Sequence, residues 1–364
     1  MGKRKLIFLF DGTGASAANL EPSETNVFRI NRAISYNSTA IFYFSGVGTR
    51  RDVIARASGA GLDEIIREAY VNLGSNYQPG DEIYVFGFSR GAVAARAFSG
   101  IISKSGLILG DGLEHYRMIW EYFILDINDP SNSAKAEKLR QTLDNYVLSG
   151  DERPRIRFLG VFDSVIGTYW PRLRNFFMET RLLDLKLDEA VECGIQLLAI
   201  DENRMPSFAP LLWSGISRDD QRLEQIWMPG VHGDVGGSSG AIFLNNVALL
   251  TMIGCCKKYG NLEWDDGFID GIKYEVDGSP FEISSERGDF ANKILLRGVR
   301  DIGGWNSGNQ YLHPVCKKLF GYDVINRGTK SKYNPEKISD LNSLPIYNIP
   351  LLNEEIDQMT DIIK

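Results

Sequence analysis

The chain has 364 residues and the composition of a globular protein, with 43% hydrophobic, 24% charged and 11% aromatic residues. This apolar content is enough to form a buried core, which excludes a wholly disordered chain. The formal net charge of −7 argues against nucleic acid as the main partner, because phosphate binding needs a concentrated basic surface. The length allows one large domain with insertions.

The first residues predict a β-strand and not a secretion signal. Lys3–Lys5 are basic and Leu6–Phe10 are apolar, but the apolar run stops at Asp11, too early for the hydrophobic part of a signal peptide. No stretch of the sequence is long enough to span a bilayer. We therefore expect a protein made in the cytoplasm, whose membrane contacts are peripheral and whose export, if any, uses a non-Sec route.

Short apolar runs alternate with longer amphipathic runs, which is the pattern of a parallel α/β sheet. The expected strands are Leu6–Phe10, Ala40–Phe44, Glu82–Phe88, Ile156–Phe162, Gln196–Ile200 and Gln225–Val231. The expected helices are Thr25–Tyr36, Gly61–Tyr77, Arg90–Ser103, Leu113–Leu125 and Phe243–Tyr259. We expect a core over 1–260 with cap insertions around 111–155 and 168–192, and an irregular C-terminal extension over 261–364 packed on that core.

The four cysteines predict buried free thiols. Cys193, Cys255, Cys256 and Cys316 include no C-x-x-C pair, and the adjacent pair lies in an apolar helical run. This arrangement favours a reducing compartment over a disulfide framework or a zinc site. The sequence also holds no metal-ligand cluster of recognisable spacing, so no metal site is assigned, although the acidic Asp11 loop and Asp234 leave metal binding open.

The strongest motif is Gly87-Phe88-Ser89-Arg90-Gly91, a G-x-S-x-G sequence. A buried strand precedes it and a run of small, helix-forming residues follows it, which is the context of a nucleophile elbow. Gly87 and Gly91 relieve the crowding of such a turn. The motif predicts an α/β-hydrolase-like, mostly parallel sheet with Ser89 as nucleophile; a structural turn with an incidental serine is the alternative.

A serine nucleophile needs a base, and the chain has three histidines. His232 follows an apolar strand in a glycine-rich segment, and we expect it to be the base. His313, in the C-terminal region, is the alternative, and His115 is expected on the surface or in a cap. For the acid, chain order favours Asp163 at the end of a strand, with Asp201 and Asp234 as rivals.

The oxyanion formed on an attacked carbonyl needs backbone donors. Arg90 directly follows the nucleophile and begins the expected helix, so its N–H is one candidate. The loop after the first strand, Asp11-Gly12-Thr13, supplies Gly12 and Thr13 as candidates for the second donor. Asp11 could instead brace this loop, bind a metal or act as a nucleophile.

Taken in order, the motifs resemble the DUF2235 family, an α/β-hydrolase group that includes phospholipase effectors of bacterial type VI secretion. The matching pieces are Phe10–Thr13, Glu24–Val27, Gly46–Thr49, Gly61–Asp63, Pro79–Glu82, Phe86–Ala92, Phe158–Val165, Leu198–Glu202, Pro229–Gly237, Leu312–Pro314 and Tyr333–Pro335. The resemblance implies ester cleavage, often of phospholipids. It leaves open an inhibitor (immunity) protein or a secretion-machinery component as partner.

The chain departs from the family pattern at a few positions. The family has Trp and Thr where this chain has Phe162 and Ser164, a His near Gln196, and a Ser at Gly233. The change at Gln196 implies a different pocket polarity or substrate choice. An aromatic and arginine-rich segment, Tyr169–Met178, suits either a lid at a membrane interface or an ordinary cap helix.

Three functions are therefore considered. The first is a phospholipase A-type serine esterase acting through Ser89, His232 and Asp163. The second is a hydrolase of soluble esters or thioesters with the same triad. No cofactor is expected for either, because hydrolysis by a serine needs only water. The third is a non-catalytic module of a secretion or defence assembly, which would need none of these residues.

Overall fold

The computed structural model describes residues 3–12, 24–35, 37, 39–46, 61–165, 186–277, 279, 281–284, 296–303 and 309–349. Its centre is a seven-stranded sheet in which every neighbouring pair of strands is parallel. The strands are β1 (Lys5–Phe10), β2 (Thr39–Phe44), β3 (Glu82–Phe88), β6 (Ile156–Phe162), β8 (Cys193–Ala199), β10 (Arg222–Met228) and β12 (Gln310–Leu312). This architecture confirms the expected fold class.

The strand order is β12-β10-β8-β6-β3-β1-β2. From β1 the chain moves outward to β2, and it then returns to the other side of β1 to build β3 and all the later strands. The direction of winding therefore reverses between β1 and β3. In open parallel sheets, the crevice outside the carboxyl ends of the strands at such a switch point is the usual place for a ligand.

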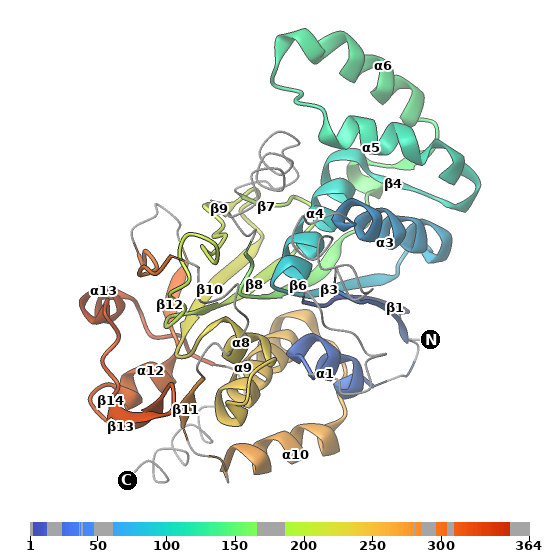
Figure 1. Ribbon diagram of the computed structural model, residues 1–364. Helices are drawn as coiled ribbons and strands as arrows, with labels where there is room; N and C mark the ends of the chain where they lie inside the picture. Colours follow the sequence, from blue (N-terminus) through green and yellow to red (C-terminus); the bar gives the residue numbers. More distant parts are fainter. Residues whose placement is uncertain are drawn as a thin grey trace.

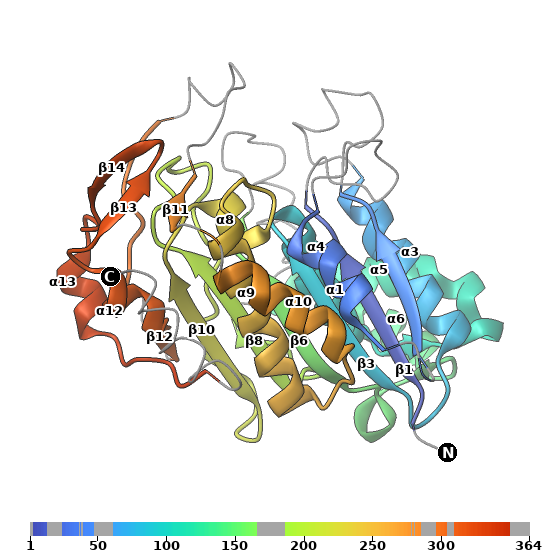
Figure 2. The ribbon, with the colours of Figure 1, turned by 90° about the horizontal axis from the view of Figure 1, so that it is seen from below.

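Helices cover both faces of the sheet, and strand alternation explains why each face is apolar (Figures 1 and 2). On β1, Leu6, Phe8 and Phe10 pack with one set of helices, whereas Ile7 and Leu9 pack with the other. The first set is α3 (Leu62–Asn76), α4 (Arg90–Ser105) and α5 (Tyr116–Ile124). The second set is α1 (Asn26–Ala33), α9 (Ile242–Cys255) and α10 (Asp266–Asp277).

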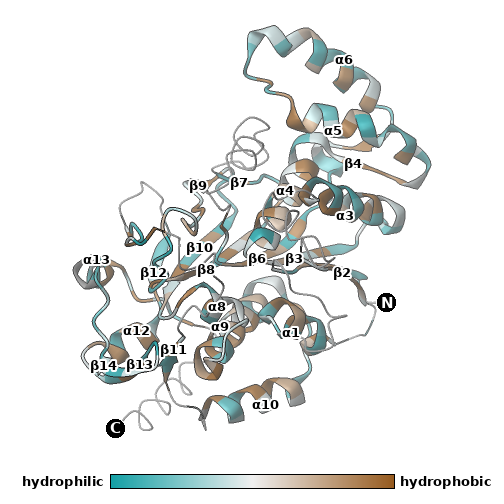
Figure 3. Ribbon diagram, viewed as in Figure 1, coloured by the Kyte–Doolittle hydropathy of each residue, from teal (hydrophilic) through white to brown (hydrophobic). Residues whose placement is uncertain are grey.

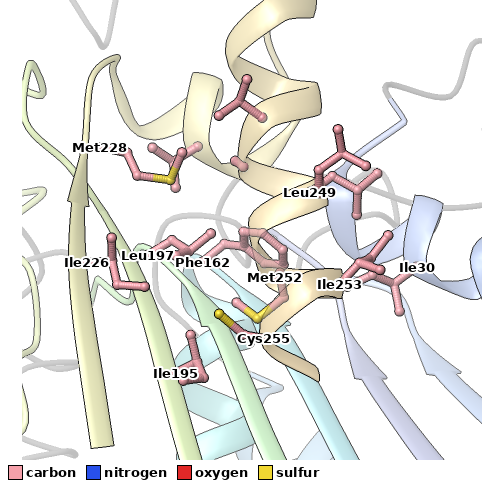
Figure 4. Packing of buried hydrophobic residues seen from close by; sticks show 14 of the residues in the cluster. Ile30, Phe162, Ile195, Leu197, Ile226, Met228, Leu249, Met252, Ile253 and Cys255 are labelled. Atoms are coloured by element: carbon pink, nitrogen blue, oxygen red, sulfur yellow. The ribbon is translucent and has the colours of Figure 1, made fainter. Parts of the chain in front are cut away.

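Figure 4 shows the second core from close by, with α9 lying over strands β6, β8 and β10. Ile195, Leu197 and Ile226 point from the strands toward Met252 and Cys255 on the helix. All five side chains are fully buried. Removing this much apolar surface from water, at about 25 cal/mol per Å², is the main stabilising contribution of the layer.

An insertion between α4 and β6 carries α5 and α6 (Ser133–Leu143) and extends away from the sheet (Figure 1). It also contains the short elements η1 (Gly110–His115), η2 (Pro130–Asn132), η3 (Gly150–Glu152), β4 (Leu107–Ile108) and β5 (Val147–Leu148). In Figure 3, α6 and α10 each combine hydrophilic and hydrophobic residues, as expected of helices with one side in solvent.

The C-terminal region contains more regular structure than the sequence pattern indicated. After a π-helical turn η4 (Cys256–Gly260) and α10 come β11 (Glu282–Ile283), β12, α12 (Pro314–Leu319), β13 (Asp323–Asn326), β14 (Thr329–Lys332) and α13 (Ile338–Ser343). Strand β12 extends the main sheet beside β10, and β11, β13 and β14 form a separate small sheet. Two further short strands, β7 (Lys186–Leu187) and β9 (Gly215–Ile216), pair with each other.

The last predicted strand ends earlier than expected, and a short helix replaces the expected glycine-rich loop. Strand β10 stops at Met228, and Gly230 takes a positive φ of 108° that turns the chain. Helix α8 (His232–Gly236) then begins, and the Asp234 carboxylate accepts a hydrogen bond from the Val231 N–H across its first turn.

Two predictions about the chain as a whole can be compared with the structure. The four cysteines are buried and free, as expected. Across the described ranges, no helix combines the length and apolar character that crossing a membrane requires. The expected Tyr169–Met178 segment lies outside the described residues.

The packing of β8 against α9 predicts a large cost for truncating Ile195. We expect Ile195→Ala to lower the free energy of unfolding by about 2–5 kcal/mol, because a fully buried isoleucine would leave a cavity. Ile127→Ala, which truncates an isoleucine that is 47% exposed, should change it by about 0.5 kcal/mol or less. Urea denaturation followed by circular dichroism measures both, and equal effects would contradict the described core.

Candidate active site

The candidate nucleophile lies at the switch point, between the end of β3 and the start of α4. Ser89 has φ 59° and ψ −124°, a backbone conformation that L-residues rarely adopt. Its N–H donates to the carbonyl of Phe162 at the end of β6, 3.1 Å away. A strained serine held between a strand and a helix N-terminus is the geometry of a nucleophile elbow.

Both elbow glycines are required by close backbone contacts. A Cβ on Gly91 would lie 2.3 Å from the carbonyl oxygen of Phe10, and one on Gly87 would lie 2.7 Å from the Cα of Ala92. Neither clash involves a flexible side chain, so the backbone itself would have to move. The glycines thus allow the start of α4 to approach the end of β1.

His232 contacts both of the other proposed triad members. Its Nε2 lies 2.8 Å from the Ser89 Oγ, and its Nδ1 lies 2.6 Å from the Asp163 Oδ2. The imidazole also packs against the ring of Phe88, 4.8 Å away, and meets Phe208 edge to face at 5.0 Å. The imidazole can therefore donate from Nδ1 to the carboxylate and accept the serine proton at Nε2.

Asp163 follows β6 at a positive φ of 43° and its side chain is fully buried. Its Oδ1 accepts a hydrogen bond from the Ala199 N–H at 3.1 Å, and its own N–H donates to the carbonyl of Leu197. The carboxylate is thus fixed between the ends of β6 and β8, and it directs Oδ2 toward the imidazole.

Sequence reasoning missed one residue of this site, Arg300. Its guanidinium donates from Nη1 to the Asp163 Oδ1 at 2.6 Å and from Nη2 to Oδ2 at 2.9 Å, and both side chains are fully buried. Burial raises the pKa of the Asp163 carboxyl most strongly, but the charge of Arg300 and the hydrogen bonds from His232 and Arg300 outweigh it. The pKa is therefore held below its usual value. No motif surrounds Arg300, so no sequence signal pointed to it.

His313, the alternative base, lies elsewhere. Its Nδ1 accepts from the Val315 N–H as the N-cap of α12, and its Nε2 lies 3.0 Å from the Thr251 hydroxyl. Because that hydroxyl donates to the carbonyl of Val247, it accepts from the imidazole. Both ring nitrogens are therefore occupied away from Ser89. His115 lies in η1 on the insertion, partly exposed and against Tyr146.

The two alternative acids make structural hydrogen bonds. Asp201 accepts from the Gly230 N–H at 2.7 Å and from the Tyr333 hydroxyl at 3.0 Å. Burial raises its pKa to about 6. Asp234 accepts from the N–H groups of Val231 and Ser284. None of these bonds involves the imidazole of His232.

The three candidate oxyanion donors differ in position. Arg90 is the first residue of α4, directly after Ser89, where the helix dipole is positive. The Gly12 N–H donates to the Asp11 Oδ1 at 2.6 Å, so it is directed toward that carboxylate. Thr13 lies outside the described residues. Of the two candidates within the described residues, Arg90 is the one at the helix start beside Ser89, whereas the Gly12 N–H is already bonded to Asp11.

Asp11 braces the loop after β1. Its carboxylate also accepts from the hydroxyls of Thr25 and Tyr43, and its backbone N–H donates to Phe44. Burial raises its pKa. Within the described ranges, no group of three or more His, Cys, Asp and Glu side chains is arranged to hold a metal ion.

Two positions at which the chain departs from the family pattern contact each other. The Ser164 hydroxyl donates to the Gln196 Oε1 at 2.7 Å, and the Gln196 Nε2 donates to the carbonyl of Leu211. Both residues are fully buried. Gln196 is therefore buried inside the protein, bonded to the residue that follows Asp163, and does not lie on an exposed surface.

The close approach at Gly91 predicts that Gly91→Ala damages the elbow. We expect the rate at which Ser89 reacts with a fluorophosphonate probe to fall about 100-fold, because the helix start must shift away from β1. Gly271→Ala is a matched control, since its Cβ would meet nothing within 4 Å. Labelling is measured on the folded proteins by mass spectrometry, and wild-type labelling of Gly91→Ala would contradict the elbow geometry.

Burial lowers the pKa of His313 to about 3, which predicts a pH-dependent contribution to stability. The imidazole is neutral in the fold and gains a proton on unfolding below about pH 6.5. The contribution of the neutral imidazole to the free energy of unfolding is therefore complete above pH 6.5, and it is lost as the pH falls toward 3. His313→Asn keeps a capping side chain, and between pH 7.5 and 5 it should lose about 2 kcal/mol less stability than wild type. Denaturation at both pH values measures this difference. If His313→Asn instead abolished the reaction of Ser89 with a fluorophosphonate probe, His313 would be identified as the base.

The chain is similar to several known proteins. Over 190 residues it is 32% identical to the uncharacterized protein YEL023C of Saccharomyces cerevisiae, an alignment that covers 44% of this chain and 26% of the yeast protein. A crystal structure of an uncharacterized Pseudomonas aeruginosa protein is similar at TM-score 0.41 and 16% identity, covering 75% of this chain and 48% of that one. The Tle1 effector bound to the VgrG spike of the type 6 secretion system is similar at TM-score 0.34 and 20% identity, covering 65% and 51%.

The chain thus spans about a quarter of the yeast protein and about half of each solved chain. Residues 4–254 match the family described as the catalytic domain of Tle1-like type VI secretion phospholipase effectors. The match confirms the resemblance to type VI secretion phospholipase effectors that the motifs indicated. Because it covers more than half of the sequence, this chain belongs to the Tle1-like phospholipase effector family.

Proposed function

We propose that the chain is a serine esterase that cleaves carboxylic esters of phospholipids, as a phospholipase A. The observation that carries the proposal is the continuous hydrogen-bonded series from Ser89 through His232 to Asp163. Family membership supports the phospholipid as substrate. No cofactor takes part, since both steps need only the side chains and water.

The mechanism follows from these contacts. His232 Nε2 takes the proton of Ser89 while Oγ attacks the ester carbonyl carbon. The negative charge that develops on the carbonyl oxygen is stabilised by the Arg90 N–H and the positive end of α4. The imidazolium then protonates the departing alcohol, which leaves an acyl-enzyme. A water molecule, deprotonated by the same imidazole, attacks the acyl carbon and releases the fatty acid, and the proton returns to Ser89.

A small hollow reaches the elbow at Gly91. It lies between the ends of β1 and β2 and the helices α3 and α4. Its lining includes the apolar side chains Phe10, Phe44, Leu62, Ile65 and Ala94. Asp11, Ser45 and Gly91 complete the lining, so the hollow is mostly apolar where it meets the elbow, which suits a hydrocarbon group better than a charged one. Peripheral contact with a lipid surface would then bring the ester to the site.

The decisive test is hydrolysis of vesicles of a phospholipid with two different acyl chains. Wild type should release fatty acid and lysolipid, identified by mass spectrometry, whereas Ser89→Ala should lose at least about 1,000-fold in rate. Ser99→Ala is a matched control, because Ser99 is a buried serine of α4, the helix that Ser89 caps, and its hydroxyl donates to the carbonyl of Ala95. It should keep wild-type activity.

Other outcomes select among the remaining functions. Cleavage of short-chain esters or thioesters alone, lost in Ser89→Ala, would retain the triad and replace the phospholipid with a soluble substrate. Activity that survives in Ser89→Ala would refute the mechanism. If wild type cleaves neither substrate and Ser89 does not react with a fluorophosphonate, the chain is better described as a non-catalytic module.

A further inference from the structure

We propose that Arg300 is a positioning residue of the catalytic site, contributed by the part of the chain beyond the family match. The proposal rests on the proposed serine esterase function. The matched region ends at residue 254, yet the triad acid within it is held by an arginine that follows it in sequence. The site that the family region supplies is therefore incomplete without the C-terminal region.

Arg300 makes four hydrogen bonds at the site. Two go to the two oxygens of Asp163, and the others go to the carbonyls of Ala199 at 2.8 Å and Phe208 at 2.7 Å. The guanidinium therefore ties the end of β6 to the end of β8. It also fixes the loop that presents the Phe208 ring to His232.

These contacts leave the Asp163 carboxylate a single orientation. Oδ1 accepts from Arg300 and from the Ala199 N–H, and Oδ2 accepts from Arg300 and from His232. A planar fork that bonds both oxygens resists rotation about the side chain's last torsion, which a single donor would allow. Because Oδ2 directs the imidazole, the orientation of the base depends on Arg300.

The charge of Arg300 acts on the same pair. A buried cation in contact with Asp163 favours the ionised carboxylate and lowers the pKa of its carboxyl group. The acceptor that the His232 Nδ1–H requires is then maintained to lower pH than it would be without the cation. Because Arg300 also neutralises part of the carboxylate's charge, Asp163 stabilises a developing imidazolium less strongly.

Other charged groups lie around this pair. Glu202 accepts from the backbone N–H of His232 at 3.3 Å, and Arg204 neutralises it through two hydrogen bonds. Asp201 and Asp234 flank the site, but they bond to backbone groups and to Tyr333. Arg90 lies at the start of α4, and burial lowers its pKa to about 10. Of these groups, only Arg300 bonds directly to the triad carboxylate.

The C-terminal region has a defined attachment that delivers Arg300. Strand β12 pairs in parallel with β10, and the His313 N–H donates to the carbonyl of Trp227. These contacts fix the C-terminal region against β10, and β10 is the strand that leads to His232. A docked C-terminal region therefore places a cation against Asp163, whereas an undocked one would leave the buried carboxylate without its guanidinium partner.

The test compares Arg300→Gln, Arg300→Lys and Arg300→Met with wild type in the full chain. The measurement is the rate of Ser89 labelling by a fluorophosphonate probe as a function of pH, on protein whose folding is checked by circular dichroism. The neutral variants should label more slowly, and the acid limb of their profile should move up by about 1–3 pH units. Arg300→Lys, which keeps the charge but not the fork, should restore the position of the limb while its maximum rate stays low.

The matched control is Arg222→Met. It removes another short arginine–carboxylate pair, to the buried Glu224 at 2.6 Å, but at the opposite end of β10. Its profile should coincide with that of wild type. A uniform loss of rate in all Arg300 variants, with no movement of the acid limb, would assign Arg300 a purely structural role and overturn the proposal.

Failure of this inference and failure of the proposed function give different results. If Ser89 of wild type does not react with the probe, the serine esterase proposal fails. If Ser89 reacts and the Gln and Lys variants share the wild-type profile, only the role of Arg300 fails. Should Arg300→Met not fold, the Gln and Lys variants still decide the question, because both keep hydrogen-bond donors.

Discussion

The buried carboxylate of Asp163 is the constraint on which the rest of the site depends. An ionised carboxylate without solvent is strongly destabilised unless partners surround it. Here a backbone N–H, an imidazole and a guanidinium supply those partners, from the end of β8, from α8 and from the C-terminal region. Each partner has to be placed for the carboxylate to stay charged. The arrangement of Ser89, His232 and Asp163 is therefore a consequence of how several distant segments satisfy one charge.

The topology of the sheet brings these segments together. Because all seven strands run in the same direction, the residues that follow them meet at one edge. Ser89 follows β3, Asp163 follows β6 and His232 follows β10 with a short turn between. Since β3 and β6 are neighbours and β8 and β10 come next, three sequence-distant residues come within hydrogen-bonding reach. The glycines at 87 and 91 let the nucleophile turn fit against β1.

The sequence predicted those features that depend on residues close together in the chain. Buried runs predicted six strands of the main sheet, and strand, glycine turn and helix predicted the elbow at Ser89. The short helix at His232 was not predicted, because its capping by Asp234 is visible only once the turn at Gly230 is known. Arg300 could not be found, because its role depends on a long-range contact with Asp163 and no motif marks it. Likewise, nothing in the sequence linked Ser164 to Gln196, although the two are hydrogen-bonded.

The choice among the three candidate acids shows what sequence cannot decide. Asp163, Asp201 and Asp234 all follow strands or turns at the same edge, and the C-terminal region donates to each of them, through Arg300, Tyr333 and Ser284. What separates them is the nature of the donor. Asp201 accepts a hydrogen bond from a neutral hydroxyl, and burial raises its pKa, so its ionised form is only weakly stabilised. Asp163 instead pairs with a cation, which stabilises its ionised form. The same region that completes the sheet edge thereby supplies the cation beside Asp163, the carboxylate that contacts His232.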